Sequence, residues 1–237
     1  MRRGPADGPS LSAPGLGKQG QRCLRRPDAA SPSAGRTLGG MDDTWSTSTS
    51  SAESSPAWVE SMGGPLLVLP VSALGEWGGS TQTGMLAGTG DVQDDYDRAC
   101  ELDGLAGVIA VGGKGRQGLV LADEPARTCY LPEYQTFVRW LGADSEASLI
   151  EAAKELLDDP AVDWEECGTW ETDGPAVLMD SVTAGTELNV AYPDDGTMPQ
   201  QAQISTPPGR WRVRAVHTWA NEETSVGLVQ LLALPQS

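Results

Sequence analysis

The stretch Arg210-Trp211-Arg212-Val213-Arg214-Ala215-Val216-His217-Thr218-Trp219 decides the fold of this chain. Apolar or aromatic side chains stand at every second position, with polar ones between: Trp211, Val213, Ala215, His217 and Trp219 against Arg212, Arg214 and Thr218. Because successive side chains of a strand point to opposite faces, this alternation predicts a half-buried β-strand. After an Asn221-Glu222-Glu223 turn, the nearly all apolar residues 226–234 predict a second strand, central in a sheet and covered on both faces.

Short apolar and β-branched runs between turn residues predict further strands along the chain. These strands are expected at residues 66–69, 105–111, 119–122, 128–131, 164–171, 176–179 and 188–192. One helical turn is expected at residues 72–77, a short helix at 96–102 and a long glycine-rich loop at 78–90.

Two helices are expected in the middle of the chain. In residues 132–141, Pro132 suits a first helical position, and the apolar residues follow helical spacing up to Gly142: Tyr134, Phe137, Val138 and Leu141. The second helix begins at Asp144 or Ser145 and ends before Pro160, with one apolar side: Leu149, Ile150, Ala153, Leu156 and Leu157. The predicted class is therefore α+β, with β-rich antiparallel sheets and two consecutive helices in the middle of the chain.

Residues 1–57 differ in composition from the rest. The first forty hold seven Lys or Arg and two acids among Gly, Pro and Ser, too few large apolar side chains to offset the entropy cost of ordering. A disordered tail is expected there, then a Ser/Thr-rich linker at residues 44–55, and a single domain over residues 58–235. No apolar run of about 7 to 15 residues marks a signal peptide. Met41 begins the acidic part, so we interpret residues 1–40 as a start-site artefact.

The part of the chain from Met41 onward is strongly acidic. It holds 31 acidic and nine basic side chains, a formal charge of about −22. A field of that sign attracts basic proteins and repels nucleic-acid phosphates and anionic lipid, although the same charge would also serve solubility alone. No apolar run approaches the roughly 20 residues of a membrane span. The expected partner is a protein, with neither nucleic acid nor membrane involved.

The sequence predicts no cofactor and no metal site. The cysteines Cys23, Cys100, Cys129 and Cys167 form no Cys-x-x-Cys pair, and their usage fits the cytoplasm. The Gly112-Gly113-Lys114-Gly115 cluster lacks the spacing of a phosphate loop and is interpreted as a hairpin turn. His217, the only imidazole, lies on an apolar strand face, which is more typical of a core residue than of a catalyst. The chain is therefore predicted not to be an enzyme.

The segment Trp164-Glu165-Glu166-Cys167-Gly168-Thr169-Trp170-Glu171 is the most suggestive of binding. A regular strand would put Trp164, Glu166, Gly168 and Trp170 on one face and the other four residues on the opposite face. Acids beside tryptophan suit an Arg/Lys-rich partner, but burial of both tryptophans in the core is the favoured alternative. The candidate partner-binding residues are Asp123, Glu124, Trp164, Glu165, Trp170, Glu171 and Asp173.

Several phrases together resemble the Immunity protein 21 family, found in bacteria and common in actinobacteria. They are Trp58-Val59-Glu60-Ser61-Met62-Gly63-Gly64-Pro65-Leu66-Leu67-Val68-Leu69-Pro70, Asp95-Tyr96-Asp97, Asp123-Glu124-Pro125, Tyr130-Leu131-Pro132, Trp164-Glu165-Glu166-Cys167, Trp170-Glu171-Thr172-Asp173-Gly174-Pro175 and Gly209-Arg210-Trp211-Arg212-Val213-Arg214. The resemblance spans about residues 58–232 and brings no catalytic residues with it.

The resemblance implies a cytoplasmic antidote of a polymorphic toxin system, a protein that binds and neutralises a cognate toxin domain. The acidic charge fits a basic toxin, because complementary charge accelerates association. Two other functions stay open: a metal-assisted hydrolase built on acidic pairs with His217, and a carbohydrate-binding domain that uses exposed tryptophans.

Overall fold

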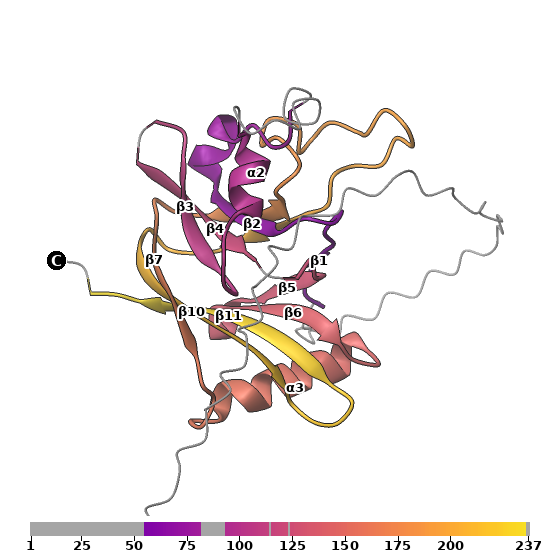
Figure 1. Ribbon diagram of the computed structural model, residues 1–237, viewed down its shortest axis with the longest axis vertical. Coiled ribbons are helices and arrows are strands. Elements are labelled where there is room, and N and C mark those ends of the chain that lie inside the picture. Colours follow the sequence, from indigo (N-terminus) through magenta and orange to yellow (C-terminus); the bar gives the residue numbers. More distant parts are fainter. Residues whose placement is uncertain (1–54, 82–92, 114, 123, 236–237) are drawn as a thin grey trace, which may run out of the picture.

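The structure is a computed structural model, which describes residues 55–81, 93–113, 115–122 and 124–235 (Figure 1). The strands of these residues form two antiparallel sheets. The six-stranded sheet has the spatial order β1 (Trp58–Val59), β5 (Thr128–Leu131), β6 (Thr136–Gly142), β11 (Ser225–Ala233), β10 (Gly209–Trp219) and β7 (Glu165–Thr172). The five-stranded sheet has the order β3 (Gly107–Val111), β4 (Arg116–Leu121), β2 (Leu66–Pro70), β8 (Ala176–Asp180) and β9 (Gln201–Ile204).

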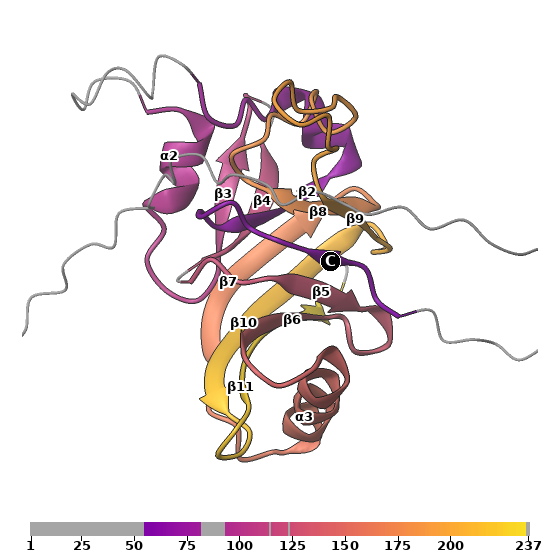
Figure 2. The ribbon, with the colours of Figure 1, turned by 90° about the vertical axis from the view of Figure 1, so that its right-hand side faces the viewer.

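Short helices cover the outer faces of the two sheets. They are the 3-10 helix η1 (Val71–Glu76), α2 (Asp95–Cys100), the 3-10 helix η2 (Pro132–Tyr134) and α3 (Glu146–Asp158). In Figure 2, α3 lies against the six-stranded sheet at one end of the molecule, and η1 and α2 lie beyond the five-stranded sheet at the other. No helix in the described ranges combines the length and apolar character needed to cross a membrane.

Three apolar cores hold these layers together. The first fills the space between the sheets and includes Val68, Phe137, Trp170 and Val213. The second joins the five-stranded sheet to η1 and α2 and is centred on Trp77. The third joins the six-stranded sheet to α3. Full burial of one Leu or Phe side chain contributes about 1.5 to 3 kcal/mol, so these cores supply most of the driving force for folding.

The hairpin that decides the fold forms as predicted. Trp211, Val213 and Ala215 of β10 point into the core between the sheets, and Arg212 on the other face is exposed. β11 pairs with β10 over the whole length of β11, from Ser225 opposite Trp219 to Ala233 opposite Trp211. β11 lies between β10 and β6 with apolar cores on both faces, so the prediction of a central covered strand is confirmed.

The helix expected from Asp144 or Ser145 is also confirmed. Ser145 is the N-cap of α3: its Oγ accepts from the Ser148 N–H at 3.1 Å, and Ser148 Oγ accepts from the Ser145 N–H at 3.2 Å. This reciprocal capping satisfies two backbone donors that the first helical turn leaves open. Leu149 and Ala153 are buried against the sheet, and Asp158 ends the helix before Pro160.

The prediction of a helix at residues 132–141, the first of the two expected in the middle of the chain, is wrong. The chain makes only one 3-10 turn at η2, and Gln135 then takes a left-handed conformation (φ 49°) that ends the turn. Residues 136–142 form the strand β6, paired with β5 and β11. Its Thr, Phe, Val and Trp side chains favour strands, and burial on both faces of the sheet produced an apolar spacing that resembled a helix.

The strand expected at residues 188–192 is wrong as well. This segment is a series of turns in the long connection between β8 and β9, and Leu188 alone of its apolar side chains is buried. The strands β1 and β9 were not predicted. The other expected strands and the short helix are confirmed with small shifts of their ends. Outside the described residues lie nearly all of the expected tail and linker, most of the loop at residues 78–90, Lys114 of the predicted hairpin turn and Asp123.

Candidate functional site

The candidate residues of the strand β7 do not share one face. β7 contains a β-bulge: Thr169 lies opposite Arg212 and Glu166 opposite Arg214, so two residues, Cys167 and Gly168, face the single residue between the arginines. Gly168 has φ 98°, a conformation that glycine adopts without strain. The bulge shifts the alternation by one position, which corrects the regular face pattern expected from the sequence.

The two tryptophans of this segment consequently lie on opposite faces of the sheet. Trp170 is buried in the core between the sheets with 0% exposure, and its Nε1 donates to the Gln117 carbonyl at 3.3 Å. Trp164 is half-buried on the α3 side, where the Arg214 guanidinium lies 4.2 Å from the ring centroid. Trp170 thus belongs to the core, as the favoured alternative expected, and offers no surface to a partner.

The outer face of β7 and β10 is of mixed charge. Arg210, Arg212 and Arg214 stand at alternate positions of β10, next to the acids of β7. Arg210 Nε lies 2.9 Å from Glu171 Oε1, and Arg212 Nε lies 3.8 Å from Glu166 Oε2. Exposed ion pairs of this kind contribute about 0 to 1 kcal/mol each. The arginines partly neutralise a patch that the sequence alone suggested was acidic.

The remaining candidates are dispersed. Glu165 and Asp173 are exposed at the two ends of β7, and Asp173 Oδ1 accepts from the Ser72 hydroxyl at 2.9 Å. Glu124 is exposed just before β5, four strands from β7 in the sheet order. At roughly 4.8 Å between neighbouring strands this is about 19 Å. The structure therefore brings Glu165, Glu171 and Asp173 to one edge strand and its following turn, and leaves Glu124 apart.

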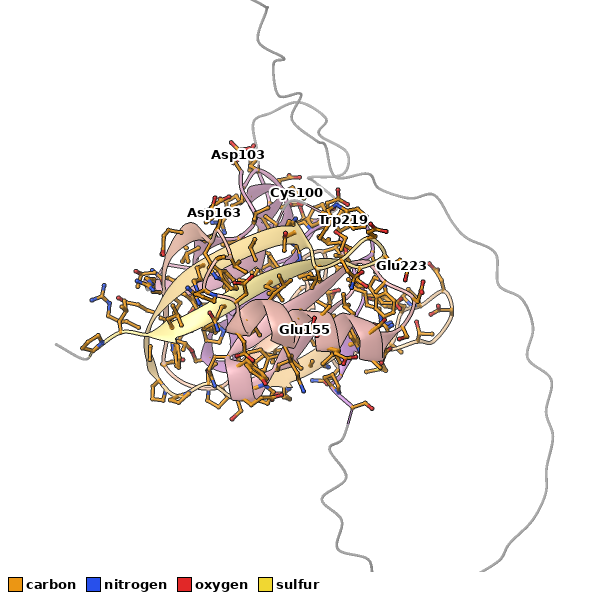
Figure 3. All side chains as sticks on the ribbon, turned by 90° about the horizontal axis from the view of Figure 1, so that it is seen from below. Cys100, Asp103, Glu155, Asp163, Trp219 and Glu223 are labelled. Atoms are coloured by element: carbon orange, nitrogen blue, oxygen red, sulfur yellow. The ribbon has the colours of Figure 1, made fainter. Side chains whose placement is uncertain are left out.

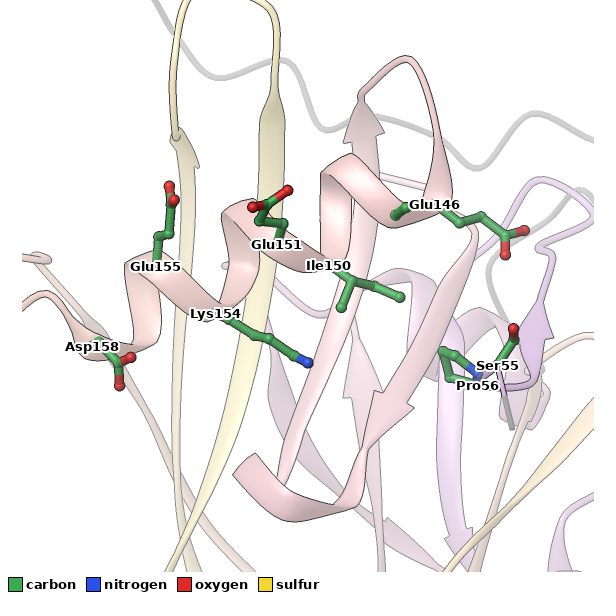
Figure 4. Close-up of a pocket in the computed structure, with 9 residues that line it drawn as sticks. Ser55, Pro56, Glu146, Ile150, Glu151, Lys154, Glu155 and Asp158 are labelled. Atoms are coloured by element: carbon green, nitrogen blue, oxygen red, sulfur yellow. The ribbon is translucent and has the colours of Figure 1, made fainter. Parts of the chain in front are cut away.

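A second acidic surface, not singled out from the sequence, runs along α3. A groove of about 660 Å³ lies between this helix and residues Ser55 and Pro56 (Figure 4). Its helical wall holds four carboxylates and one ammonium group: Glu146, Glu151, Glu155, Asp158 and Lys154. Glu146 is paired with Arg127 at 2.7 Å, and Lys154 lies 5.9 Å from the ring centroid of Tyr134. Glu155 of this wall is exposed to solvent (Figure 3).

His217 is half-buried and lies beside the buried Arg139. Arg139 is 1% exposed, and its guanidinium donates to the carbonyl oxygens of Ala122 and Glu124. His217 Nε2 lies 3.2 Å from Arg139 Nη1, and since a guanidinium can only donate, Nε2 is the acceptor. Arg139 thereby connects β6 with the loop before β5, and His217 of β10 lies against its guanidinium. The contact supports the predicted hydrogen bond of this histidine, while its side chain is half-buried rather than buried.

The described residues offer little for the metal-hydrolase or sugar-binding alternatives. No group of three or more His, Cys, Asp or Glu side chains within them is placed to hold a metal ion. The tryptophans of the described ranges are buried or half-buried with one exception, Trp219, which is 67% exposed at the end of β10 near Glu223 (Figure 3). The free thiols Cys129 and Cys167 are weakly acidic, because burial raises the pKa of Cys129 to about 12 and that of Cys167 to about 11.

Comparison with known proteins gives one match. The family model described as Immunity protein 21 matches residues 57–224. These residues include the whole of α3 and every described strand except β11, which begins at Ser225. No curated protein and no solved structure matches this chain.

Proposed function

Because the chain belongs to the Immunity protein 21 family, we propose that it is an immunity protein that binds and neutralises a cognate toxin domain. The family match carries this proposal: it begins at residue 57, one residue before β1, and covers most of the folded part. Such a protein acts by stoichiometric binding and needs no catalytic group. The cytoplasm, where the toxin would otherwise act, is the proposed place of action.

The distribution of charge supports a basic toxin domain as the partner. From Met41 onward, acids outnumber bases by 22, and the α3 groove presents Glu151, Glu155 and Asp158 at its rim. Complementary charge raises association rates toward about 10⁸ to 10⁹ per molar per second. Rapid capture is what an antidote requires, because a free toxin molecule acts until it is bound.

The experiment that tests the proposed function is co-expression with the neighbouring gene. We expect the product of that gene to stop growth when it is expressed alone, to be tolerated with this chain, and to co-purify with it as a complex. A neighbour that is harmless alone and never co-purifies would refute the proposal.

The exposed acids predicted from the sequence are proposed contacts to be tested in the same complex. Charge reversal of Glu165, Glu171 or Asp173 should weaken binding without lowering the melting temperature if the residue faces the toxin. Glu171→Lys has a matched control in Arg210→Glu, which breaks the same ion pair but adds negative charge. Unchanged affinity would remove that residue from the interface.

A further inference from the structure

The connection between β8 and β9, residues 181–200, exposes two apolar side chains close to each other in sequence. Val190 is 57% exposed and Met198 is 49% exposed, and Met62, in the turn after β1, is 59% exposed. Apolar side chains that gather on a protein surface commonly mark an interaction site. These three residues are called the Met62–Met198 surface below.

Two hydrogen bonds bring the three residues into one neighbourhood. The Glu60 N–H donates to Gln200 Oε1 at 2.9 Å, and the Tyr192 hydroxyl lies 3.6 Å from Met62 Sδ. Met62 takes part in the second hydrogen bond, Val190 lies two positions from Tyr192, and Met198 lies two positions from Gln200. Figure 1 shows the connection as a long excursion of the chain beyond the five-stranded sheet.

The connection is held in place at its base. Leu188 is buried in the core around Trp77, and its carbonyl accepts from Gln201 Nε2 at 3.0 Å. The Gly185 N–H donates to the Trp77 carbonyl at 2.9 Å. Nearer the tip, the Tyr192 N–H donates to the Thr197 carbonyl at 2.8 Å. A surface that is ordered before binding loses less conformational entropy when a partner arrives.

The rim of this surface is negative. Glu60, Glu187, Asp194 and Asp195 are exposed on the two segments that build it. The sequence has no Lys or Arg at all over residues 41–97 and 155–209, which include both segments. Among the described residues, Arg127 reaches it with Nε 3.6 Å from Glu60 Oε1. Two hydrogen bonds from Thr197 lower the pKa of Asp195, so this carboxylate stays ionised.

We infer that the Met62–Met198 surface is where the toxin domain docks, and that the toxin presents an apolar depression ringed by Lys or Arg. This inference rests on the proposed function and adds the site to it. Flexible methionine side chains adapt to the shape of a partner, and the apolar centre with a charged rim is the usual layout of a specific interface. Of the described basic residues, Arg127 contributes a positive charge at Glu60, and Lys or Arg side chains of the partner would complement the remaining acids.

The affinity of the purified chain for the product of the neighbouring gene tests this inference. Val190→Asp and Met198→Asp should each weaken the dissociation constant at least tenfold, because each places an unpaired charge in the apolar centre. Trp219→Asp is the control: Trp219 is 67% exposed at the end of β10, four strands from β1 in the sheet order. It should change the dissociation constant less than twofold. Equal melting temperatures would show that all three variants fold.

The possible outcomes separate the two proposals. If the wild-type chain binds the neighbour's product and both Asp variants bind it equally well, the docking site is wrong while the proposed function stands. If the wild-type chain does not bind, both are overturned. Sedimentation velocity of the chain alone tests whether a second copy of the chain binds this surface instead. A wild-type dimer that dissociates in the Val190→Asp variant would overturn the assignment of this surface to a toxin.

Discussion

At the scale of single residues, Gly227 shows how tightly the interior polar pair is packed. A Cβ at Gly227 of β11 would lie 2.9 Å from Cδ2 and Nε2 of His217 and 3.1 Å from Cβ of Arg139. The imidazole cannot turn away without lengthening its 3.2 Å contact with Arg139 Nη1. Glycine at this position therefore allows β6 and β10 to hold their polar side chains on either side of β11.

Substitution of Gly227 by Ala should destabilise the fold by about 1 to 3 kcal/mol, the usual cost of overpacking a filled core. Urea denaturation followed by tryptophan fluorescence measures this change. Gly113→Ala is the matched control, since its Cβ would meet nothing within 4 Å, and it should stay within about 0.5 kcal/mol of wild type. Equal losses in both variants would contradict the packing argument.

Asp180 is a second residue whose environment has a measurable consequence. Burial raises its pKa, although N–H groups of Val182 and Met62 donate to its carboxylate and oppose the shift. A carboxyl group with a raised pKa binds its proton more tightly in the folded state. Its contribution to stability is therefore complete below the unfolded pKa of about 3.9 and declines as pH rises through the folded pKa.

The variant Asp180→Asn removes this titration. Relative to Asp180→Asn, the wild-type protein should lose free energy of unfolding as pH rises from about 4 toward neutrality. The loss of one acceptor for the Met62 N–H adds an offset that does not depend on pH. Chemical denaturation of both proteins across this range gives the difference, and a difference that stays constant or grows in favour of wild type would refute the raised pKa.

At the scale of elements, the sequence was most informative where one face of a segment is buried and the other is wet. β10 and α3 meet this condition, and the alternation of Trp211, Val213 and Ala215 and the cap at Ser145 identified them. β6 does not, because apolar cores lie on both of its faces, and its period was hidden. The apolar side chains of this segment therefore imitated helical spacing, because periodicity alone does not separate a strand buried on both faces from a helix.

The candidate site was harder to predict, for a related reason. The β7 bulge depends on which residue of β10 each β7 residue faces, and no local pattern encodes a long-range register. The arginines of β10 were visible in the sequence, but their pairing with Glu166 and Glu171 was not. At residues 188–192 the alternating Leu188, Val190 and Tyr192 imitated a strand, although the segment has no partner strand in the described sheets.

The cap of α3 gives a prediction at this scale. Ser145→Ala removes the acceptor for the Ser148 N–H and should lower stability by about 1 kcal/mol. Thermal or urea unfolding measures the loss, with Ser205→Ala, at an exposed position in the loop between β9 and β10, as the control. If the Ser145→Ala loss does not exceed that of the control, the capping box contributes nothing to stability.

At the scale of the whole molecule, negative charge is spread over opposite ends. The α3 groove lies beyond the six-stranded sheet, and the acids of the 181–200 connection lie beyond the five-stranded sheet. Exposed charges are screened over about 10 Å at 0.1 M salt. At low salt a basic partner is therefore attracted from many directions, while short-range contacts at the interface determine its dissociation rate.

Association with the toxin domain should accordingly depend on ionic strength. Stopped-flow measurements between about 0.05 and 0.5 M NaCl should show the association rate constant falling roughly tenfold or more, with a much smaller change in the dissociation rate constant. Chloride replaced by acetate at equal ionic strength controls for specific anion effects. An association rate that does not respond to salt would exclude electrostatic steering.

Leu188 anchors the base of the 181–200 connection, so the residues that hold this connection in place differ from the exposed residues available for recognition. Because Leu188 and Gly185 secure the base, substitutions of the exposed outer side chains are expected to cost little stability. We expect these side chains to tolerate substitution with little loss of folding stability, as side chains in the hypervariable loops of an antibody do. A protein with the proposed function could change its recognition of a partner through these exposed side chains, and the same connection is a natural place to graft new recognition in the laboratory.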